Sequence, residues 1–250
     1  MSQAITKVTG TIDGRGFSVP IGTTLLEAAK SLGLTIPTLC HHPGLPADGN
    51  CRLCLVETGG KLVASCLFPL RTDGEAILTQ SPMVLEARAF TVRLLLSRAP
   101  EDPRLLELAR EYGTGPDPRL ADGADGCLRC GLCVRACRAS GTEAIALVGR
   151  GRERKVTGPF FEPPIDCVGC LACARVCPTG FIDFSELPRS IWGRDFDLRP
   201  CPQCGRPVGT PEELRRAGVE NPLCPSCRRL SYSRSLMGLP EASFSNPGER

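Results

Sequence analysis

Two cysteine runs with the same internal spacing, C-x2-C-x2-C-x3-C, constrain this chain more than any other feature. They are Cys127, Cys130, Cys133 and Cys137, and then Cys167, Cys170, Cys173 and Cys177. This spacing lets three thiolates of one tight loop bind a [4Fe–4S] cube, and in two-cluster chains the fourth cysteine of each run binds the other cube. We therefore expect one cube on Cys127, Cys130, Cys133 and Cys177. The second cube is expected on Cys137, Cys167, Cys170 and Cys173, which would join both runs into one small domain.

A disulfide framework is the alternative explanation for the sixteen cysteines of this chain. The N-terminal sequence MSQAITKVTG lacks the apolar stretch of a signal peptide. Thiols at C-x-x-C spacing in a chain without such a signal indicate metal or redox sites instead. No apolar run reaches the length of a membrane span. We therefore expect a cytoplasmic protein without direct membrane insertion.

The formal net charge of +3 counts every cysteine as neutral. Metal-bound thiols are deprotonated, so four thiolates around a core of about +2 leave each site near −2. Four such sites bring the net charge to about −5. The loaded protein is thus expected to be acidic, which disfavours a nucleic-acid partner.

Residues 1–98 predict a β-grasp domain within an α+β chain. A hairpin is expected over residues 1–20 with its turn at Asp13-Gly14, and the capping box Thr24-x-x-Glu27 predicts a helix across it. Further strands and a long helix are expected at Leu53–Glu57, Leu62–Ser65, Ala76–Thr79, and from the Ser81 cap to before Pro100.

Four cysteines of this domain, Cys40, Cys51, Cys54 and Cys66, have the spacing C-x10-C-x2-C-x11-C. The plant-type [2Fe–2S] spacing begins C-x4-C-x2-C, so this set indicates a [2Fe–2S] site with a longer first loop. A single zinc ion is the alternative. The neighbouring His41 and His42 are interpreted as ordinary loop residues, although they could donate hydrogen bonds near a cluster. Neither fits the two-His, two-Cys pattern of a Rieske centre.

Residues 99–122 are rich in Pro, Asp and Gly around a short helix, Arg104–Tyr112, and are interpreted as a linker. The dicluster region is expected at 123–186. Between its two runs, alternating apolar residues predict a hairpin with a basic tip, Arg150–Lys155. This tip is either a solvated turn or a docking surface for an acidic partner.

Residues 187–250 contain the last cysteine set: Cys201, Cys204, Cys224 and Cys227. The spacing C-x2-C-x19-C-x2-C predicts a zinc-ribbon-like unit with a closed, structural site. A rubredoxin-like single iron and a further iron–sulfur cluster are the alternatives. Thr210 is expected to cap a short helix that starts at Pro211. Residues 229–250 are expected to be a loose tail, or one that orders only against a partner.

The order of these motifs resembles a known family. CHHPGL and CRLCLVE, followed by CLRCGLCVRACR and CVGCLACARVCPTG, resemble the N-terminal part of the large iron–sulfur subunit of respiratory complex I. They also resemble the iron–sulfur diaphorase subunit of cytoplasmic NAD(P)-linked hydrogenases and the front half of iron-only hydrogenases. The resemblance covers about residues 1–186 and implies the same [2Fe–2S] and [4Fe–4S] ligands as the spacing does.

The chain departs from that family in two places. Its members usually carry an extra cube on a His plus three Cys motif between the first domain and the dicluster. Residues 67–126 here contain no Cys and no His, so we expect that cluster to be missing. The C-terminal four-cysteine unit is not part of the common pattern.

The sequence contains no G-x-G-x-x-G loop, flavin fingerprint or nickel-binding pattern. We therefore expect a non-catalytic electron-transfer subunit between an FMN- and NAD(P)-binding flavoprotein and a [NiFe] hydrogenase, with ferredoxin as a partner if the complex bifurcates electrons. The alternatives are the same subunit of an NAD(P)-linked formate dehydrogenase or flavin-based transhydrogenase, and a free ferredoxin-type carrier. An iron–sulfur subunit of succinate dehydrogenase is disfavoured by the long first loop, and a zinc-ribbon regulator by the charge.

Overall fold

The computed structural model describes residues 7–120 and 124–237, so the first residues of the predicted hairpin and the end of the predicted tail lie outside the described residues. The chain divides into two compact units, which interleave in sequence. The first unit contains the residues up to 136 together with 147–156 and 176–181; the second contains 137–146, 157–175 and the residues from 182 onward.

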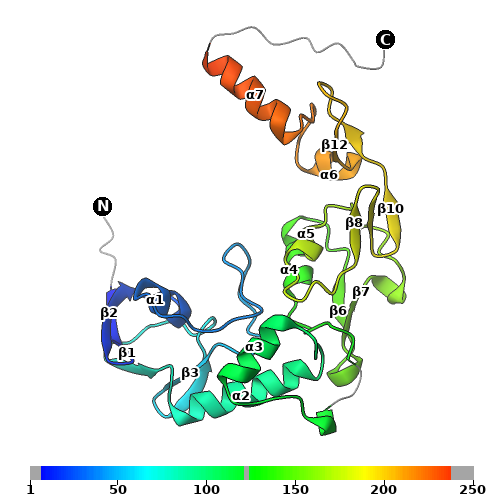
Figure 1. Ribbon diagram of the computed structural model, residues 1–250. Helices are drawn as coiled ribbons and strands as arrows, with labels where there is room; N and C mark the ends of the chain where they lie inside the picture. The colour runs from blue at the N-terminus through cyan, green and yellow to red at the C-terminus, as the bar shows by residue number, and fades with distance from the viewer. Residues whose placement is uncertain (1–6, 121–123, 238–250) are drawn as a thin grey trace, which may run out of the picture. The chain divides into compact units, whose positions relative to one another are not determined.

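The first unit contains a five-stranded sheet with a helix across it, as the β-grasp prediction requires. Its elements are β1 (Lys7–Ile12), β2 (Arg15–Pro20), α1 (Leu25–Ser31), β3 (Leu55–Thr58), β4 (Lys61–Ala64) and β5 (Glu75–Leu78). The strand order is β2-β1-β5-β3-β4, with β1 parallel to β5 and the other pairs antiparallel. In Figure 1 this sheet and α1 form the blue and cyan part of the chain. Apolar side chains of β1, β2, β5 and α1 fill its core.

Local sequence explains the first elements of this domain. Asp13 and Gly14 connect β1 to β2 with φ angles of 48° and 78°, which suits a tight hairpin turn because Asp and Gly tolerate the left-handed region. Thr24 caps α1 by accepting a hydrogen bond from the Glu27 N–H at 3.3 Å, and the Glu27 carboxylate accepts from the Thr24 N–H at 2.9 Å. The predicted hairpin and capping box are therefore confirmed.

Two helices extend the first unit and lie side by side in Figure 1: α2 (Pro82–Leu96) and α3 (Pro103–Glu111), followed by the 3-10 turn η1 (Pro118–Leu120). Ser81 caps α2 and Asp102 caps α3. Leu105 and Leu108 of α3 pack into one core with Leu95 and Leu96 of α2. The segment interpreted as a linker therefore contributes to a hydrophobic core, because its short helix carries an apolar face that α2 covers.

Short elements surround the two central cysteine runs. They are α4 (Leu132–Ala139), β6 (Ala146–Val148), η2 (Gly151–Glu153), β7 (Lys155–Thr157), η3 (Pro159–Phe161) and α5 (Ala172–Arg175). Strands β6 and β7 pair as the predicted hairpin. The basic tip includes η2, and whether it docks a partner stays a prediction.

The second unit continues with two small sheets and two helices. They are β8 (Phe184–Glu186), β9 (Arg189–Ile191), β10 (Arg194–Phe196), β11 (Arg199–Pro200), β12 (Pro207–Gly209), α6 (Pro211–Arg216) and α7 (Pro225–Leu236). Strands β8 to β10 form an antiparallel sheet that the sequence did not predict, because its Arg189 and Arg194 bind carbonyls 20 and 30 residues earlier, beyond the range of a local pattern.

Two predictions for the C-terminal elements had different outcomes. The helix at Pro211 is confirmed, with Thr210 as its cap. The loose tail expected from residue 229 is wrong for the residues up to Leu236, which continue α7. This helix starts at Pro225, and the Cys224 side chain accepts from the Cys227 N–H as its cap.

None of the helices in the described residues is long and apolar enough to cross a membrane. The longest, α2, has 15 residues, whereas a span needs about 20.

Candidate iron–sulfur and metal sites

The four cysteines of the β-grasp domain are buried and lie in two pairs. The Cys54 and Cys66 sulfurs are 3.4 Å apart, and the Cys51 N–H donates to the Cys40 sulfur at 3.4 Å. A [2Fe–2S] cluster held by four thiolates needs two sulfurs for each iron, so two pairs fit it.

Each pair holds one sulfur that ionises readily. A hydrogen bond from the Cys40 thiol lowers the pKa of Cys51 to about 5. The Cys66 thiol lowers the pKa of Cys54 to about 6 in the same way, and the pKa values of the two donor thiols are raised. Because the thiolate is the form that binds metal, each pair presents one ligand in its binding form at neutral pH.

The strands position the second pair. Cys54 directly precedes β3 and Cys66 follows β4, whose residues pair in the register Leu55 with Ala64. From α2, the buried Arg88 side chain donates from Nη2 to the Leu55 carbonyl at 2.8 Å. The hairpin and this arginine therefore fix the backbone that presents Cys54.

The two histidines of the first loop have different surroundings. His42 Nδ1 accepts a hydrogen bond from the Gly44 N–H at 3.1 Å, as an ordinary loop residue does. His41 Nδ1 is buried and has no hydrogen-bond partner among the described residues. Burial, followed by the charge of Lys30, lowers the pKa of His41, so its ring is neutral at pH 7.

The set expected for the first cube, Cys127, Cys130, Cys133 and Cys177, lies entirely within the first unit. Burial raises the pKa of Cys127 to about 12, with the Asp125 carboxylate and the Cys177 thiol adding to it. Burial also raises the pKa of Cys130 to about 11, and the Cys177 and Cys127 thiols contribute. Burial therefore disfavours the thiolate form of both cysteines, and a bound iron core would supply the positive charge that ionises them.

A second contact joins the two segments of this set. Thr179 Oγ1 donates to the Gly126 carbonyl at 2.8 Å and lies 3.7 Å from the Cys177 sulfur. The residue after Gly126 is Cys127. The threonine therefore anchors the end of the second run beside the start of the first, as the crossed ligand assignment needs.

One arginine joins the [2Fe–2S] loop to the loop of the first cube. Arg135 of α4 donates from Nη2 to the Cys40 carbonyl at 2.5 Å and to the Cys130 carbonyl at 3.4 Å, and from Nη1 to the Pro46 carbonyl at 2.5 Å. Asn50 Nδ2 also approaches the Cys130 carbonyl, at 3.4 Å. No local sequence pattern indicates this role, because the acceptors are up to 95 residues away.

The set expected for the second cube lines one small, apolar cavity of the second unit. Its walls include Cys137, Cys167, Cys170 and Cys173 together with Ile145, Leu171, Ile191 and Trp192. Burial raises the pKa of Cys173 to about 11; the Trp192 side chain opposes this and the Cys170 and Cys137 thiols add to it. Cys137 therefore meets the three cysteines of the other run, as the crossed assignment needs.

Residues beyond the second run hold its loop. Arg194 of β10 donates from Nη1 to the Pro164, Ile165 and Cys167 carbonyls at 2.7, 2.6 and 3.1 Å. Arg189 of β9 donates from Nη1 to the Gly169 carbonyl at 2.8 Å. Gly169 has φ +71°, and a Cβ there would lie 2.7 Å from the Phe196 ring. The loop and the unpredicted sheet thus fit together only with glycine at this position.

The last set, Cys201, Cys204, Cys224 and Cys227, is much more compact. Its four sulfurs all lie within 4.8 Å of one another, and the Cys204 and Cys224 sulfurs are 3.6 Å apart. Burial would raise the pKa of Cys201, but the backbone N–H groups of Cys224 and Gln203 outweigh it and lower the pKa to about 6. The cysteines are in place to act together as ligands.

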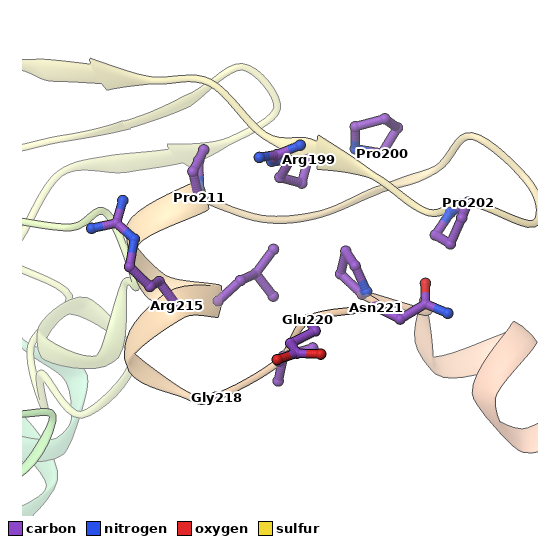
Figure 2. A pocket seen from close by; sticks show the side chains of 11 residues that line it. Arg199, Pro200, Pro202, Pro211, Arg215, Gly218, Glu220 and Asn221 are labelled. Atoms are coloured by element: carbon purple, nitrogen blue, oxygen red, sulfur yellow. The ribbon is translucent and has the colours of Figure 1, made fainter.

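Figure 2 shows an open cavity within the C-terminal four-cysteine unit, between β11 and the segment that follows α6. Arg199, Arg215 and Glu220 line it together with several prolines. Its lining contains no cysteine or histidine. The candidate metal ligands of this unit are the four cysteines, and none of them lines the cavity.

Two known domain families match the chain. The 2Fe-2S iron-sulfur cluster binding domain matches residues 6–82, and the 4Fe-4S dicluster domain matches residues 123–184. Both therefore fall on the cysteine sets that the spacing selected. The C-terminal four-cysteine unit lies beyond both matches.

Relatives with similar sequences are much longer proteins. An NADH-quinone oxidoreductase subunit of Rhizobium meliloti (strain 1021) is 31% identical, over 78% of this chain and 26% of that protein. The HndD subunit of the NADP-reducing hydrogenase of Solidesulfovibrio fructosivorans is 34% identical, over 74% of this chain and 37% of that protein. The chain therefore spans about a quarter to little more than a third of the length of these relatives.

A solved structure shows the same relationship. A chain of the NAD+-reducing [NiFe]-hydrogenase in the H2-reduced state matches with a TM-score of 0.58 and 29% identity, over 69% of this chain and 85% of that chain. The chain thus carries the two kinds of iron–sulfur cluster domain that the family models describe. More particularly, it is related to an NADH-quinone oxidoreductase subunit and to subunits of NAD-linked hydrogenases, which confirms the resemblance seen in the motifs.

Proposed function

We propose that this chain relays single electrons between a flavoprotein that oxidises or reduces NAD(P)H and a second redox module. NAD(P)H gives up two electrons as hydride, whereas iron–sulfur clusters carry them singly, so a flavin partner has to separate the pair. The proposed ligands are Cys40, Cys51, Cys54 and Cys66 for [2Fe–2S], and the two crossed sets of four for the [4Fe–4S] cubes. The C-terminal set is proposed to hold zinc.

The observation that carries this proposal is the bridge at Arg135. One guanidinium binds carbonyls of Cys40 and Cys130, which belong to two different cluster sets. Asn50, which directly precedes Cys51, also has its Nδ2 3.4 Å from the Cys130 carbonyl oxygen, so segments of the two sets are near neighbours. Residues 67–126 contain no Cys or His that could bind an intervening cube. We therefore propose that electrons pass directly between the [2Fe–2S] set and the first cube set, which Arg135 holds together.

The second redox module is proposed to be a [NiFe] hydrogenase, located in the cytoplasm with the rest of the complex. The NAD+-reducing [NiFe]-hydrogenase and the NADP-reducing hydrogenase subunit among the relatives support this choice. If the complex also uses ferredoxin, it would bifurcate electrons. The alternative is the corresponding subunit of an NAD(P)-linked formate dehydrogenase or flavin-based transhydrogenase, since the same relay would serve either.

Two measurements test the proposal. Anaerobically purified chain should contain about ten irons and about ten labile sulfides, with no additional cube. Purified under native conditions from its source, it should come with a flavoprotein and a hydrogenase subunit. A holoprotein that elutes alone in gel filtration at its own mass, 26.7 kDa, would support the free ferredoxin-type carrier instead. A folded but colourless protein would lack iron–sulfur clusters and would contradict the proposed electron relay.

A further inference from the structure

The four-cysteine set beyond the matched domains has the geometry of a site for one ion. A tetrahedral zinc with Zn–S distances of about 2.3 Å places its sulfurs about 3.8 Å apart, close to the 3.6 Å between Cys204 and Cys224. A cube needs its four ligands on four different irons, so its sulfurs stand further apart. Backbone N–H groups of Cys224 and Cys227 point at the Cys201 and Cys224 sulfurs, at 3.4 and 3.5 Å, and compensate thiolate charge.

The first two ligands fix the strand that leads into α6. The Cys201 N–H donates to the Arg206 carbonyl at 2.7 Å, and the Gly205 N–H donates to the Cys201 carbonyl at 2.9 Å. This closed turn leads into β12 (Pro207–Gly209), which is followed by Thr210, the cap of α6. An ion on Cys201 and Cys204 would therefore set where α6 begins.

Helix α6 in turn contacts both segments of the second cube set. Thr210, which is 2% exposed, donates from Oγ1 to the Val168 carbonyl at 2.6 Å. Arg216, at the other end of the helix, donates from Nη1 to the Gly141 carbonyl at 2.6 Å. Val168 lies between Cys167 and Cys170, and Gly141 lies four residues after Cys137.

A third contact works through an ion pair. Glu213 accepts the Thr210 N–H at 3.2 Å in the capping box and lies 3.5 Å from Arg189. Arg189 donates to the Gly169 carbonyl at 2.8 Å. Three residues of α6 and its cap therefore hold the backbone around the second cube set.

We propose that Cys201, Cys204, Cys224 and Cys227 bind one zinc ion, and that this ion braces the second cube by holding α6 against its loops. The proposal rests on the proposed function in that the second set carries a cube and the C-terminal set holds zinc. Because the ion has no open coordination position, it takes no part in electron transfer. Residues 187–237 thus add a metal-dependent support to a cluster whose ligands lie elsewhere.

The first experiment identifies the ion in the full chain prepared anaerobically. About one zinc per chain is expected, and X-ray absorption at the zinc edge should show about four sulfurs at about 2.3 Å. The variant Cys204→Ala should lose the zinc. An eleventh iron in place of zinc, or oxygen and nitrogen ligands at the zinc, would overturn the assignment.

The second experiment tests the brace through Thr210→Val and Arg216→Ala, which keep the four cysteines. Both should retain zinc and ten irons but release iron from the second cube to a chelator about tenfold faster, since groups that orient metal ligands have effects of that size. Amide exchange should rise at residues 164–173. Arg215→Ala is the matched control, because Arg215 is 72% exposed and pairs with Glu212 on the same helix.

The spectroscopic and iron-release measurements distinguish a failure of the zinc brace from a failure of the proposed electron-transfer function. The electron paramagnetic resonance signals of the first cube and the [2Fe–2S] cluster should be unchanged in Thr210→Val, Arg216→Ala and Cys204→Ala. Unchanged iron release and amide exchange in Thr210→Val, Arg216→Ala and the zinc-free Cys204→Ala would overturn the brace. A wild-type chain without any cube would instead show the failure of the proposed function.

Discussion

Arg135 donates a hydrogen bond from Nη2 to the backbone carbonyl of Cys40, 95 residues earlier in the chain, at 2.5 Å. The same nitrogen approaches the Cys130 carbonyl. Through this one side chain, the first turn of α4 holds a loop of the β-grasp domain. The relationship is independent of any bound cluster, because the groups that make it are a guanidinium and two backbone oxygens.

Arg135→Ala is expected to loosen the two ligand loops from each other without removing a ligand. Iron content should remain near ten, while electron transfer from the [2Fe–2S] cluster to the first cube slows about tenfold. Rapid reduction with freeze-quench spectroscopy measures this, and amide exchange at residues 40–46 should rise. Arg138→Ala is the control on the same helix, because Arg138 is 70% exposed. Equal transfer rates in both variants would contradict the bridge.

The crossed ligand sets make a prediction about pairs of variants. Cys177→Ala and Cys127→Ala should each lose about four irons and abolish the same spectroscopic signal. Cys137→Ala and Cys167→Ala should abolish the other signal. If each run bound its own cube, Cys177→Ala would instead match Cys167→Ala, so the pairing of signals distinguishes the two arrangements.

Asp13 connects the first hairpin to the end of β5. Its carboxylate accepts from the Thr79 N–H at 2.7 Å and from the Thr79 hydroxyl at 2.5 Å, and Thr79 is buried. Asp13→Ala should lower the free energy of unfolding by about 2 kcal/mol, because it leaves these donors unpaired. Asp13→Asn keeps one acceptor and tolerates the positive φ, so its loss should be about 1 kcal/mol. Urea unfolding under anaerobic conditions measures the free energy of unfolding of both variants. An equal decrease in Asp13→Ala and Asp13→Asn would contradict the role of the hydrogen bonds to Thr79.

Asp73 predicts a pH dependence. Hydrogen bonds from the Thr9 N–H and hydroxyl, at 2.7 and 2.9 Å, lower its pKa below the ordinary value of 3.8. A carboxylate with a lowered folded pKa stabilises the fold fully above the unfolded value and loses that contribution as the pH falls through the folded one. Asp73→Asn should therefore lower the urea midpoint equally at pH 7 and pH 5.

The difference between wild type and Asp73→Asn should narrow only below about pH 4. Glu101→Gln, at an exposed position of the same unit, serves as the control for removing a negative charge. A difference between wild type and Asp73→Asn that changes from pH 7 to pH 5 would show that another group is responsible.

A secondary-structure element was predictable from the sequence when the residues that stabilise it lie close together in the chain. The capping box at Thr24, the turn at Asp13 and the Pro211 helix were predictable because their bonds join residues within a few positions. The sheet of β8 to β10 was not, because its Arg189 and Arg194 bind carbonyls of the second run's loop that lie 20 and 30 residues earlier. Helix α7 was not predictable either, since it has no apolar face to reveal it.

By itself, the sequence indicated the candidate cysteine sets, because three cysteines of each central run lie within a few residues of one another. It determined the capped helices and the first hairpin for the same reason. Only the tertiary structure decided that Arg135 joins two cysteine-bearing loops, that α3 packs on α2, and that α6 and its cap contact the loops of the second set. Those contacts cross up to 95 residues, and the path of the folded chain, not the local pattern, brings their partners together.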